Sequence, residues 1–296
     1  LIGQFASETG KKAGEFYTPH GPAQLLTRIA IMGQEDKKGL QVYDPCMGSG
    51  SLLLSCKNYS NEPDYIKYYG QELMPSTYNL ARMNMFLHKV HPENQVLHNG
   101  DTLDADWPTD VETGFDMVTM NPPYSAKWSA AKGFLQDERF MDYGGKLAPK
   151  SKADYAFLLH GFYHLKQTGT MAIVLPHGVL FRGAAEKTIR ETLLKNGSIY
   201  AVIGLPANMF YNTSIPTCII VLKKHREGRD VLFIDASNQF EKEKKQNVMK
   251  EEHIEHVLEL YQNRETVDKE AYLASFEDIK ENDFNLNIPR YVDTFE

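Results

Sequence analysis

Short apolar runs alternate with longer amphipathic stretches from about Leu40 to Asp235, and this alternation constrains the fold more than any other feature. Such alternation is typical of βαβ units that build a mostly parallel sheet. We expect strands at 40–43, 66–71, 95–98, 115–120, 170–175, 199–205, 217–222 and 231–234, and helices at 22–32, 76–88, 152–166, 184–195 and 249–263. The sequence therefore predicts an α/β fold, a doubly wound and mostly parallel sheet with a C-terminal helical tail.

The composition changes after Asp235, where charged and polar residues begin to dominate. We expect residues 1–235 to form one domain and residues 236–296 to form a tail that docks a partner. Residues 124–150 combine glycine, proline and mixed charges, and this pattern predicts a long functional loop. Because the chain begins with Leu1, we also expect a further segment upstream of it.

The formal net charge of −7 bears directly on possible partners. Nucleic-acid binding depends on lysines and arginines that replace phosphate counterions, so a nucleic-acid function needs a local basic groove or a basic partner. The three cysteines form no CxxC pair and the ten histidines form no HExxH motif, so we expect no metal site. No apolar run approaches the roughly 18 residues of a membrane span, which favours a cytoplasmic protein without membrane contact.

A tight glycine turn follows the first expected strand, which ends at Asp44. Its residues Gly48, Ser49 and Gly50 allow backbone amides and a helix N-terminus to approach an anionic group of a bound cofactor. Leu53 stands where a dinucleotide fingerprint has its third glycine, so that type of site is not indicated. A plain strand-to-helix turn is the alternative interpretation.

Carboxylates follow the next two expected strands. Glu72 ends the second strand, where a carboxylate in this class of fold accepts hydrogen bonds from a ribose diol. Asp101 follows the third strand and has the position to accept a hydrogen bond from the amino group of a cofactor adenine. Alternatively, Glu72 is a helix-start glutamate that favours the helix dipole, and Asp101 belongs to a simple Asn-Gly turn.

The strand expected at 115–120 ends at the sequence Asn121-Pro122-Pro123-Tyr124. The prolines stop the strand and stiffen the corner, so the Asn121 side-chain oxygen and the Pro122 carbonyl can face one spot. Two such acceptors can hold both protons of a planar amino group and turn its lone pair toward an electrophile. Tyr124 offers an aromatic face for stacking a base turned out of a duplex. The alternative is a strand-ending loop with a capping asparagine.

The chain resembles the modification subunits of Type I restriction-modification systems, a branch of the amino-methyltransferases. The resemblance is carried by residues 14–19 (Gly-Glu-Phe-Tyr-Thr-Pro), the turn from Asp44 to Gly50, the Asn121–Tyr124 motif and residues 285–291. It implies S-adenosyl-L-methionine as cofactor and methyl transfer to the exocyclic amino group of adenine in double-stranded DNA. It also implies a separate specificity subunit, and it leaves a restriction subunit and a second copy of the chain open as partners.

The same resemblance implies further site residues. It implies that a segment of four residues closes one side of the cofactor cleft, namely Phe16, Tyr17, Thr18 and Pro19, with Tyr17 and Thr18 near the methionine moiety of the cofactor. Asp154 corresponds to a stretch flanking the cofactor and the target adenine, and Phe210 to the aromatic residue that sandwiches the base opposite Tyr124. Alternatively, Phe16 and Phe210 are core aromatics and Asp154 is a helix-start acid. The helical region that usually precedes the Phe-Tyr-Thr-Pro segment is absent here.

Two rival functions stay open. An Asn-Pro-Pro-Tyr corner suits any planar amino group, so the substrate is alternatively a protein glutamine amide or an RNA adenine. A non-catalytic scaffold that binds cofactor or DNA is the second rival. The scaffold alternative is weakened because a non-catalytic protein would not need all of the site residues that this chain has together, namely Gly48, Gly50, Glu72, Asn121 and Tyr124.

Overall fold

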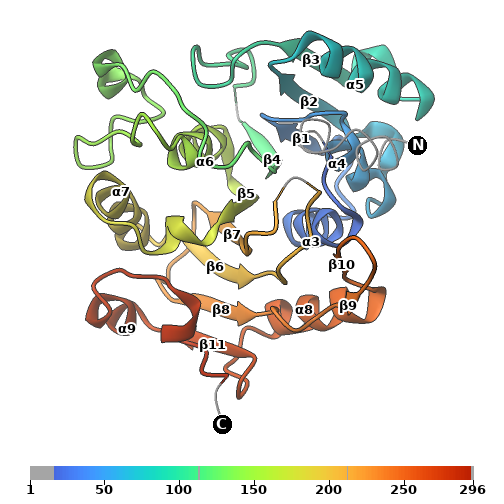
Figure 1. The fold of residues 1–296 in the computed structure, drawn as a ribbon. Coiled ribbons are helices and arrows are strands. Elements are labelled where there is room, and N and C mark those ends of the chain that lie inside the picture. Colours follow the sequence, from blue (N-terminus) through green and yellow to red (C-terminus); the bar gives the residue numbers. More distant parts are fainter. Residues whose placement is uncertain (1–16, 113, 212, 295–296) are drawn as a thin grey trace.

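A central sheet organises the molecule, seen in the middle of Figure 1. The computed structural model describes residues 17–112, 114–211 and 213–294, and within them this sheet has nine strands in the order β11-β8-β6-β7-β5-β4-β1-β2-β3. The strands are β1 (Gln41–Asp44), β2 (Lys67–Glu72), β3 (Gln95–Asn99), β4 (Phe115–Met120), β5 (Leu165–Pro176), β6 (Ile199–Gly204), β7 (Thr217–Lys223), β8 (Val231–Asp235) and β11 (Ala271–Ala274). Their pairing is parallel except where β7 meets β5 and β6 and where β11 meets β8.

Helices cover both faces of the sheet (Figure 1). One face packs against α3 (His20–Ile31), α4 (Ser51–Leu54), α5 (Pro75–Leu87) and α8 (Glu251–Asn263). The other face packs against α6 (Asp154–Tyr163) and α7 (Ala184–Lys195). The remaining elements are α9 (Phe276–Glu281), the small hairpin of β9 (Glu241–Lys242) and β10 (Asn247–Val248), and the 3-10 turns η1 (Ser55–Asn58), η2 (Pro63–Tyr65), η3 (Pro92–Asn94), η4 (Lys132–Gln136), η5 (His177–Leu180) and η6 (Ile288–Arg290).

This arrangement confirms the predicted doubly wound sheet, and each of the eight expected strands is present with its ends shifted by a few residues. Several expected helix boundaries differ from the observed ones by one to three residues, and two of the differences have a clear physical reason. The helix expected at 152–166 ends at Tyr163, because β5 already begins at Leu165 to pair with β4. The helix expected to begin at Pro22 begins at His20, so this proline lies inside the first turn, where a missing N–H does no harm.

The central strands are buried on both sides, which explains why their sequences are continuous apolar runs. All six residues of β4 are buried, including Asp116, whose carboxylate accepts from Gln41 N at 2.9 Å and pairs with Lys166 Nζ at 3.1 Å. Gly197 adopts a φ of +70° directly after Asn196, the C-cap of α7, and this left-handed glycine ends the helix. The expected long loop after β4 contains the single short turn η4 among its described residues.

The C-terminal segment shares the core of the sheet. Strand β11 extends the sheet edge beside β8, and Tyr291 stacks on Phe233 of β8 with ring centroids 3.9 Å apart. Phe284, Leu286 and Ile288 lie in the same buried cluster as residues of β4 and β5. The boundary at residue 235 therefore does not separate two cores, and the docking role of residues 236–296 stays a prediction.

Among the helices of the described chain, none is both long enough and apolar enough to cross a bilayer.

Candidate active site at the carboxyl ends of β1 and β4

The site is positioned by the reversal of strand order between β1 and β4. These strands are parallel neighbours, with Tyr43 opposite Val118, so the segments after Asp44 and after Met120 emerge side by side. In an open α/β sheet this reversal opens a crevice at the carboxyl ends of the strands. The Asp44 turn and the Asn121 corner are therefore neighbours in this crevice.

A pocket occupies this crevice at the ends of β1, β2, β3 and β4. It is lined by Pro45, Cys46, Glu72, Leu73, Met74, Thr77, Gly100, Asp101, Thr102, Asn121, Pro123 and Phe157. Three residues expected from the sequence, Glu72, Asp101 and Asn121, are thus brought together. The apolar part of the lining was not anticipated, since residues such as Leu73 and Met74 carry no motif that marks them.

The glycine turn lies beside the pocket without lining it. Gly48 and Gly50 have φ values of 54° and 82°, and Gly50 is the residue before α4. These left-handed conformations are ones that side-chain-bearing residues adopt with strain, which explains the glycines. Ser49 is buried, and its carbonyl accepts a hydrogen bond from Asn84 Nδ2 at 3.0 Å, which fixes the turn against α5.

Two carboxyl groups at the crevice have pKa values above their ordinary range. Asp44 is fully enclosed behind the pocket, and burial together with nearby Glu72 raises its pKa to about 8. Burial also raises the pKa of Glu72, although hydrogen bonds from the backbone of Met74 and Leu73 oppose the shift. A positively charged ligand would stabilise the ionised form of both groups, so the crevice is suited to a cation.

Local hydrogen bonds fix the other two carboxylates in place. Glu72 Oε2 accepts from Met74 N at 3.0 Å, at the start of α5. Asp101 Oδ1 accepts from Leu103 N at 3.0 Å and so closes the turn after β3. Both hydrogen bonds match the alternative structural interpretations, and both carboxylates still line the pocket.

The corner after β4 holds the Asn121 amide at both ends. Its Nδ2 donates to Thr18 Oγ1 at 3.1 Å, and its Oδ1 accepts from the Tyr124 hydroxyl at 2.6 Å. Thr18 therefore lies against Asn121, although 103 positions separate the two residues in the sequence. Pro122 is buried beneath the corner, and Pro19 precedes α3 directly.

Aromatic rings surround this corner. Tyr124 meets Phe210 edge to face, with centroids 6.1 Å apart and an interplanar angle of 89°. These two rings are thus brought together, but their faces are not parallel. Tyr17 stacks on Tyr211 at 5.7 Å, a contact that the sequence did not indicate. Phe16 lies outside the described residues.

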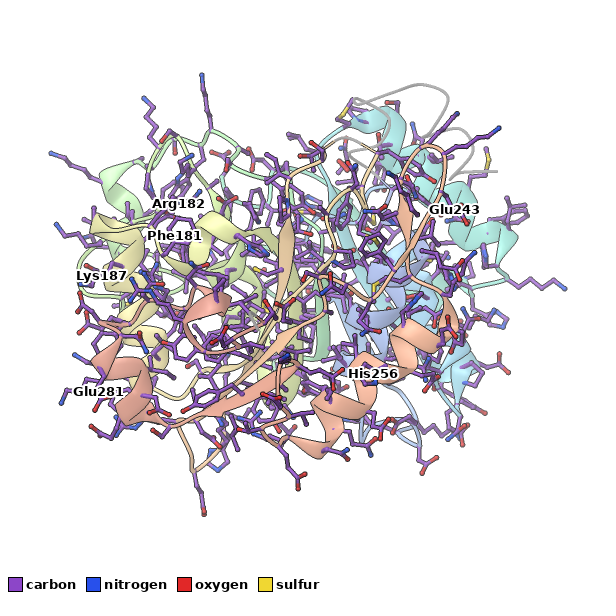
Figure 2. All side chains as sticks on the ribbon, turned by 60° about the horizontal axis from the view of Figure 1, so that its bottom comes forward. Phe181, Arg182, Lys187, Glu243, His256 and Glu281 are labelled. Carbon is purple, nitrogen blue, oxygen red and sulfur yellow. The ribbon has the colours of Figure 1, made fainter. Side chains whose placement is uncertain are left out.

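Asp154 supports the corner from behind. It is buried and does not line the pocket, and its Oδ1 accepts from Ser125 N at 2.7 Å. Its charge is balanced by Arg182, whose guanidinium lies 2.8 Å away and also binds Glu186. Arg182, labelled beside Phe181 in Figure 2, comes from the segment between β5 and α7. No local pattern could have revealed this partner.

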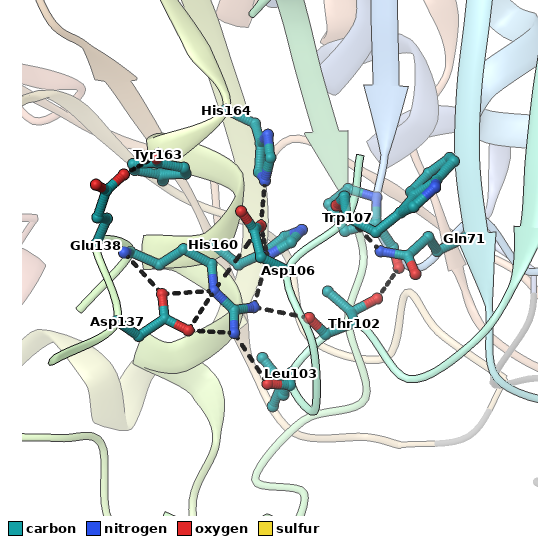
Figure 3. A network of polar contacts seen from close by, with 12 residues as sticks. Gln71, Thr102, Leu103, Asp106, Trp107, Asp137, Glu138, His160, Tyr163 and His164 are labelled. Carbon is teal, nitrogen blue, oxygen red and sulfur yellow. Dashed lines mark hydrogen bonds and ion pairs between the residues drawn. The ribbon is translucent and has the colours of Figure 1, made fainter. Parts of the chain in front are cut away.

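A second polar cluster lies next to the pocket, where Asp106, His160 and His164 gather closely enough to suggest metal ligands (Figure 3). Arg139 is buried among them and donates to His160 Nδ1 at 3.0 Å. Burial, His164 and Arg139 all lower the pKa of His160, so this imidazole is neutral. Because the guanidinium already supplies the positive charge, the cluster has a structural role. The absence of a metal site stays a prediction.

Known proteins match this chain over nearly its whole given sequence. Residues 1–296 match the family model described as N-6 DNA Methylase. The chain is 42% identical over 305 residues to the Type I restriction enzyme MpnII methylase subunit of Mycoplasma pneumoniae, covering 99% of this chain and 56% of that protein. It is 33% identical over 307 residues to the MjaVIII methylase subunit of Methanocaldococcus jannaschii, covering 99% and 52%.

Solved structures agree. The crystal structure of a type I restriction-modification system methyltransferase subunit from Streptococcus thermophilus superposes with a TM-score of 0.96 at 65% identity, covering 99% of this chain and 62% of that one. A modification subunit of a putative type I restriction enzyme from Vibrio vulnificus has the same fold, with a TM-score of 0.75 at 21% identity over 97% of this chain and 62% of that one. The chain spans about half the length of the curated relatives described above.

Proposed function

The chain belongs to the N-6 DNA methylase family, and from that premise we propose that it transfers a methyl group from S-adenosyl-L-methionine to the exocyclic amino group of adenine in double-stranded DNA. We further propose that it does so as the modification subunit of a Type I restriction-modification complex. The observation that carries the proposal is the placement of the Asn121 acceptor on the wall of a pocket at the β1/β4 reversal.

The polar groups in and beside the pocket fit S-adenosyl-L-methionine. Glu72 would accept hydrogen bonds from the ribose, and Asp101 from the adenine amino group of the cofactor. Amides of the Gly48–Gly50 turn would face its carboxylate, and Thr18 would lie near its methionine moiety. The raised pKa of Asp44 supports this assignment, because a buried carboxyl group of this kind favours a positively charged ligand. When bound, the cofactor supplies the electrophilic methyl group.

The residues of this chain then act by position. Asn121 Oδ1 and the Pro122 carbonyl would accept the two protons of the target amino group, which turns the nitrogen lone pair toward the methyl group. Tyr124 and Phe210 would hold the extruded base, which requires one of the two rings to turn from the edge-to-face arrangement. Asp154 would keep the corner in place through Ser125. The nucleophile is the amine itself, so no covalent enzyme intermediate forms.

Target choice would lie with a specificity subunit, and the segment 236–296 would help to dock it. A restriction subunit and a second copy of the chain are further proposed partners, and the complex would work in the cytoplasm. Within this chain, residues 1–235 would form the catalytic domain.

Transfer of labelled methyl groups from S-adenosyl-L-methionine separates the candidate functions. We expect incorporation into duplex DNA, at N6 of adenine after nucleoside digestion, by the full-length protein in its native complex. Label in RNA adenine or in protein glutamine would support the rival substrates. Cofactor binding without transfer to any of the three would support the non-catalytic scaffold.

A further inference from the structure

The loop that follows the catalytic corner departs from the charge of the rest of the chain. Residues 125–153 contain six basic residues against three acidic ones, a local charge of +3 in a chain whose net charge is −7. The basic residues are Lys127, Lys132, Arg139, Lys146, Lys150 and Lys152. A local surplus of this kind is the electrostatic footprint of an anionic partner.

Three of these lysines are gathered where the loop begins and ends. Trp128 N donates to Lys150 O at 3.1 Å, and Ala153 N donates to Ala126 O at 2.8 Å, so the two ends of the loop run side by side. The Trp128 indole closes them further by donating to Pro149 O at 3.0 Å. We call this paired region, residues 126–128 and 149–153, the lysine neck. It carries Lys127, Lys150 and Lys152.

The lysine neck adjoins the proposed base site. Ser125, bound to Asp154 at 2.7 Å, is the only residue in sequence between Tyr124 and the start of the neck. The loop is also anchored away from the neck, because Arg139 donates to Leu103 O at 3.2 Å and to the carbonyl of the pocket-lining Thr102 at 2.9 Å. The backbone that carries the three lysines is therefore held in place by these hydrogen bonds.

Their charges are not neutralised within the described part of the chain. Lys127 and Lys150 are exposed and Lys152 is half-buried, and none of the three forms an ion pair with a described acid. Three nearby acids have other partners, since Asp137 pairs with Arg139, Glu138 accepts from the Tyr163 hydroxyl, and Asp154 pairs with Arg182. The third acid of the loop, Asp142, is exposed. The positive charge is available to a ligand.

We propose that Lys127, Lys150 and Lys152 bind the phosphates of the DNA strand that carries the target adenine. The inference rests on the proposed function. An extruded nucleotide stays joined to the phosphates on either side of it, so a base held at Asn121 brings its backbone anions to the surface next to that corner. Contacts of this kind position the strand without reading its sequence. The lysine neck would thus supply the local basic groove that an acidic chain needs.

The test replaces all three lysines by glutamine in the full-length protein, purified with its partners through a tag. Binding of a duplex oligonucleotide is measured against salt concentration. Each lost phosphate contact is expected to flatten the slope of log Kobs against log[salt] by about 0.9, hence by about 2.7 for three. The affinity for S-adenosyl-L-methionine is expected to stay unchanged, which verifies the fold.

Two further variants separate charge from architecture. A triple replacement by arginine is expected to keep the wild-type slope. A matched control, Lys38→Gln with Lys67→Gln and Lys89→Gln, removes equal charge from exposed lysines outside the neck and outside the proposed docking segment, and it is expected to leave the slope unchanged. An equal flattening in this control would overturn the proposal, because it would then reflect net charge alone.

The remaining outcomes are also decisive. A wild-type slope in the glutamine variant refutes the phosphate contacts. If that variant instead loses a partner subunit during purification while its slope is retained, the surface binds an acidic protein and the proposal is wrong. Failure of the wild-type protein to methylate DNA would sink the proposed function, whereas the slope measurement judges the lysine neck independently.

Discussion

At the scale of single residues, the site depends on a few side chains whose partners restrict them. Asn121 is held by Thr18 on one side and Tyr124 on the other, and Asp44 is enclosed behind the pocket. Each restriction reduces the reorganisation needed at the moment of reaction. Changes at these positions should therefore affect catalysis more than folding.

Asn121→Ala is expected to reduce kcat for DNA methylation by about 10²–10³-fold or more, because an acceptor aimed at the reacting amine is lost. Cofactor affinity, measured by calorimetry, should change little. Asn58→Ala, at an exposed asparagine away from the pocket, serves as the control and should retain full activity. An active Asn121→Ala enzyme would contradict the mechanism.

Two variants of Tyr124 distinguish the role of its aromatic ring from the role of its hydroxyl group. Tyr124→Phe keeps the aromatic face and should retain most activity, although the hydrogen bond to Asn121 is lost. Tyr124→Ala removes a stacking interaction worth about 1–3 kcal/mol, which corresponds to a loss of about 5- to 150-fold in kcat/KM. Steady-state kinetics on duplex DNA measure both. Equal losses in the two variants would show that the hydroxyl, not the face, is what matters.

Asp44 should make cofactor binding depend on pH. Its pKa of about 8 means that the carboxyl is protonated in the empty protein at neutral pH, and a bound cation lowers that pKa. Binding therefore releases a proton below pH 8, and affinity rises with pH until that point. Titration calorimetry in buffers of different ionisation enthalpy measures the released proton. Asp44→Asn, which leaves the titration of the cofactor itself unchanged, should lose both the released proton and the rise in affinity toward pH 8.

At the scale of elements, long loops are fixed by buried polar side chains. Arg139, in the loop between β4 and α6, is buried and binds Asp137, His160 and two carbonyls of the loop after β3. Two segments without regular structure are thus joined by one guanidinium. The rigid fork of arginine is well suited to this, since its donors diverge in a fixed geometry.

Arg139→Met is expected to lower the free energy of unfolding by about 3 kcal/mol, because its partners are left buried without their donor. Arg82→Met, at an exposed arginine of α5 that stacks only on Tyr78, should cost less than about 0.5 kcal/mol. Denaturant unfolding monitored by fluorescence compares the two. Similar stabilities for both variants would refute the structural role of Arg139.

The sequence predicted the features that depend on neighbouring residues and missed those that depend on distant ones. Strands and the residues at their carboxyl ends are local signals, so Glu72, Asp101 and the Asn121 corner could be placed in advance. Contacts between segments far apart in sequence could not be predicted from the periodicity of apolar residues. Examples are the ion pair of Asp154 with Arg182 and the hydrogen bonds of Arg139. Strand β11 was missed because it is a four-residue edge strand in a charged context.

At the scale of the whole molecule, the C-terminal segment completes the sheet and its core. Tyr291 lies flat on Phe233, with an interplanar angle of 7°, and its hydroxyl donates to Asn285 O at 2.6 Å. The segment proposed to dock a partner is therefore mechanically continuous with the strands that carry the site. A partner bound there would act on a rigid body.

Tyr291→Ala should lower the free energy of unfolding by about 3 kcal/mol, since a buried aromatic ring is removed. Tyr291→Phe, which loses only the hydroxyl contact, should cost about 1 kcal/mol. Thermal and denaturant unfolding measure both. A neutral Tyr291→Ala would mean that the segment is not part of the cooperative core.

The orientation of the Asn121 amide has a consequence for which bases the corner accepts. Its nitrogen donates to Thr18 and its oxygen accepts from the Tyr124 hydroxyl, so a second lone pair on that oxygen is what the amide can offer to an incoming group. A keto base would set one oxygen against another with no proton between them, and the two would repel. An amino base supplies that proton. The contacts of Thr18 and Tyr124 with the amide thus favour a purine with an amino group at this position over one with a keto group.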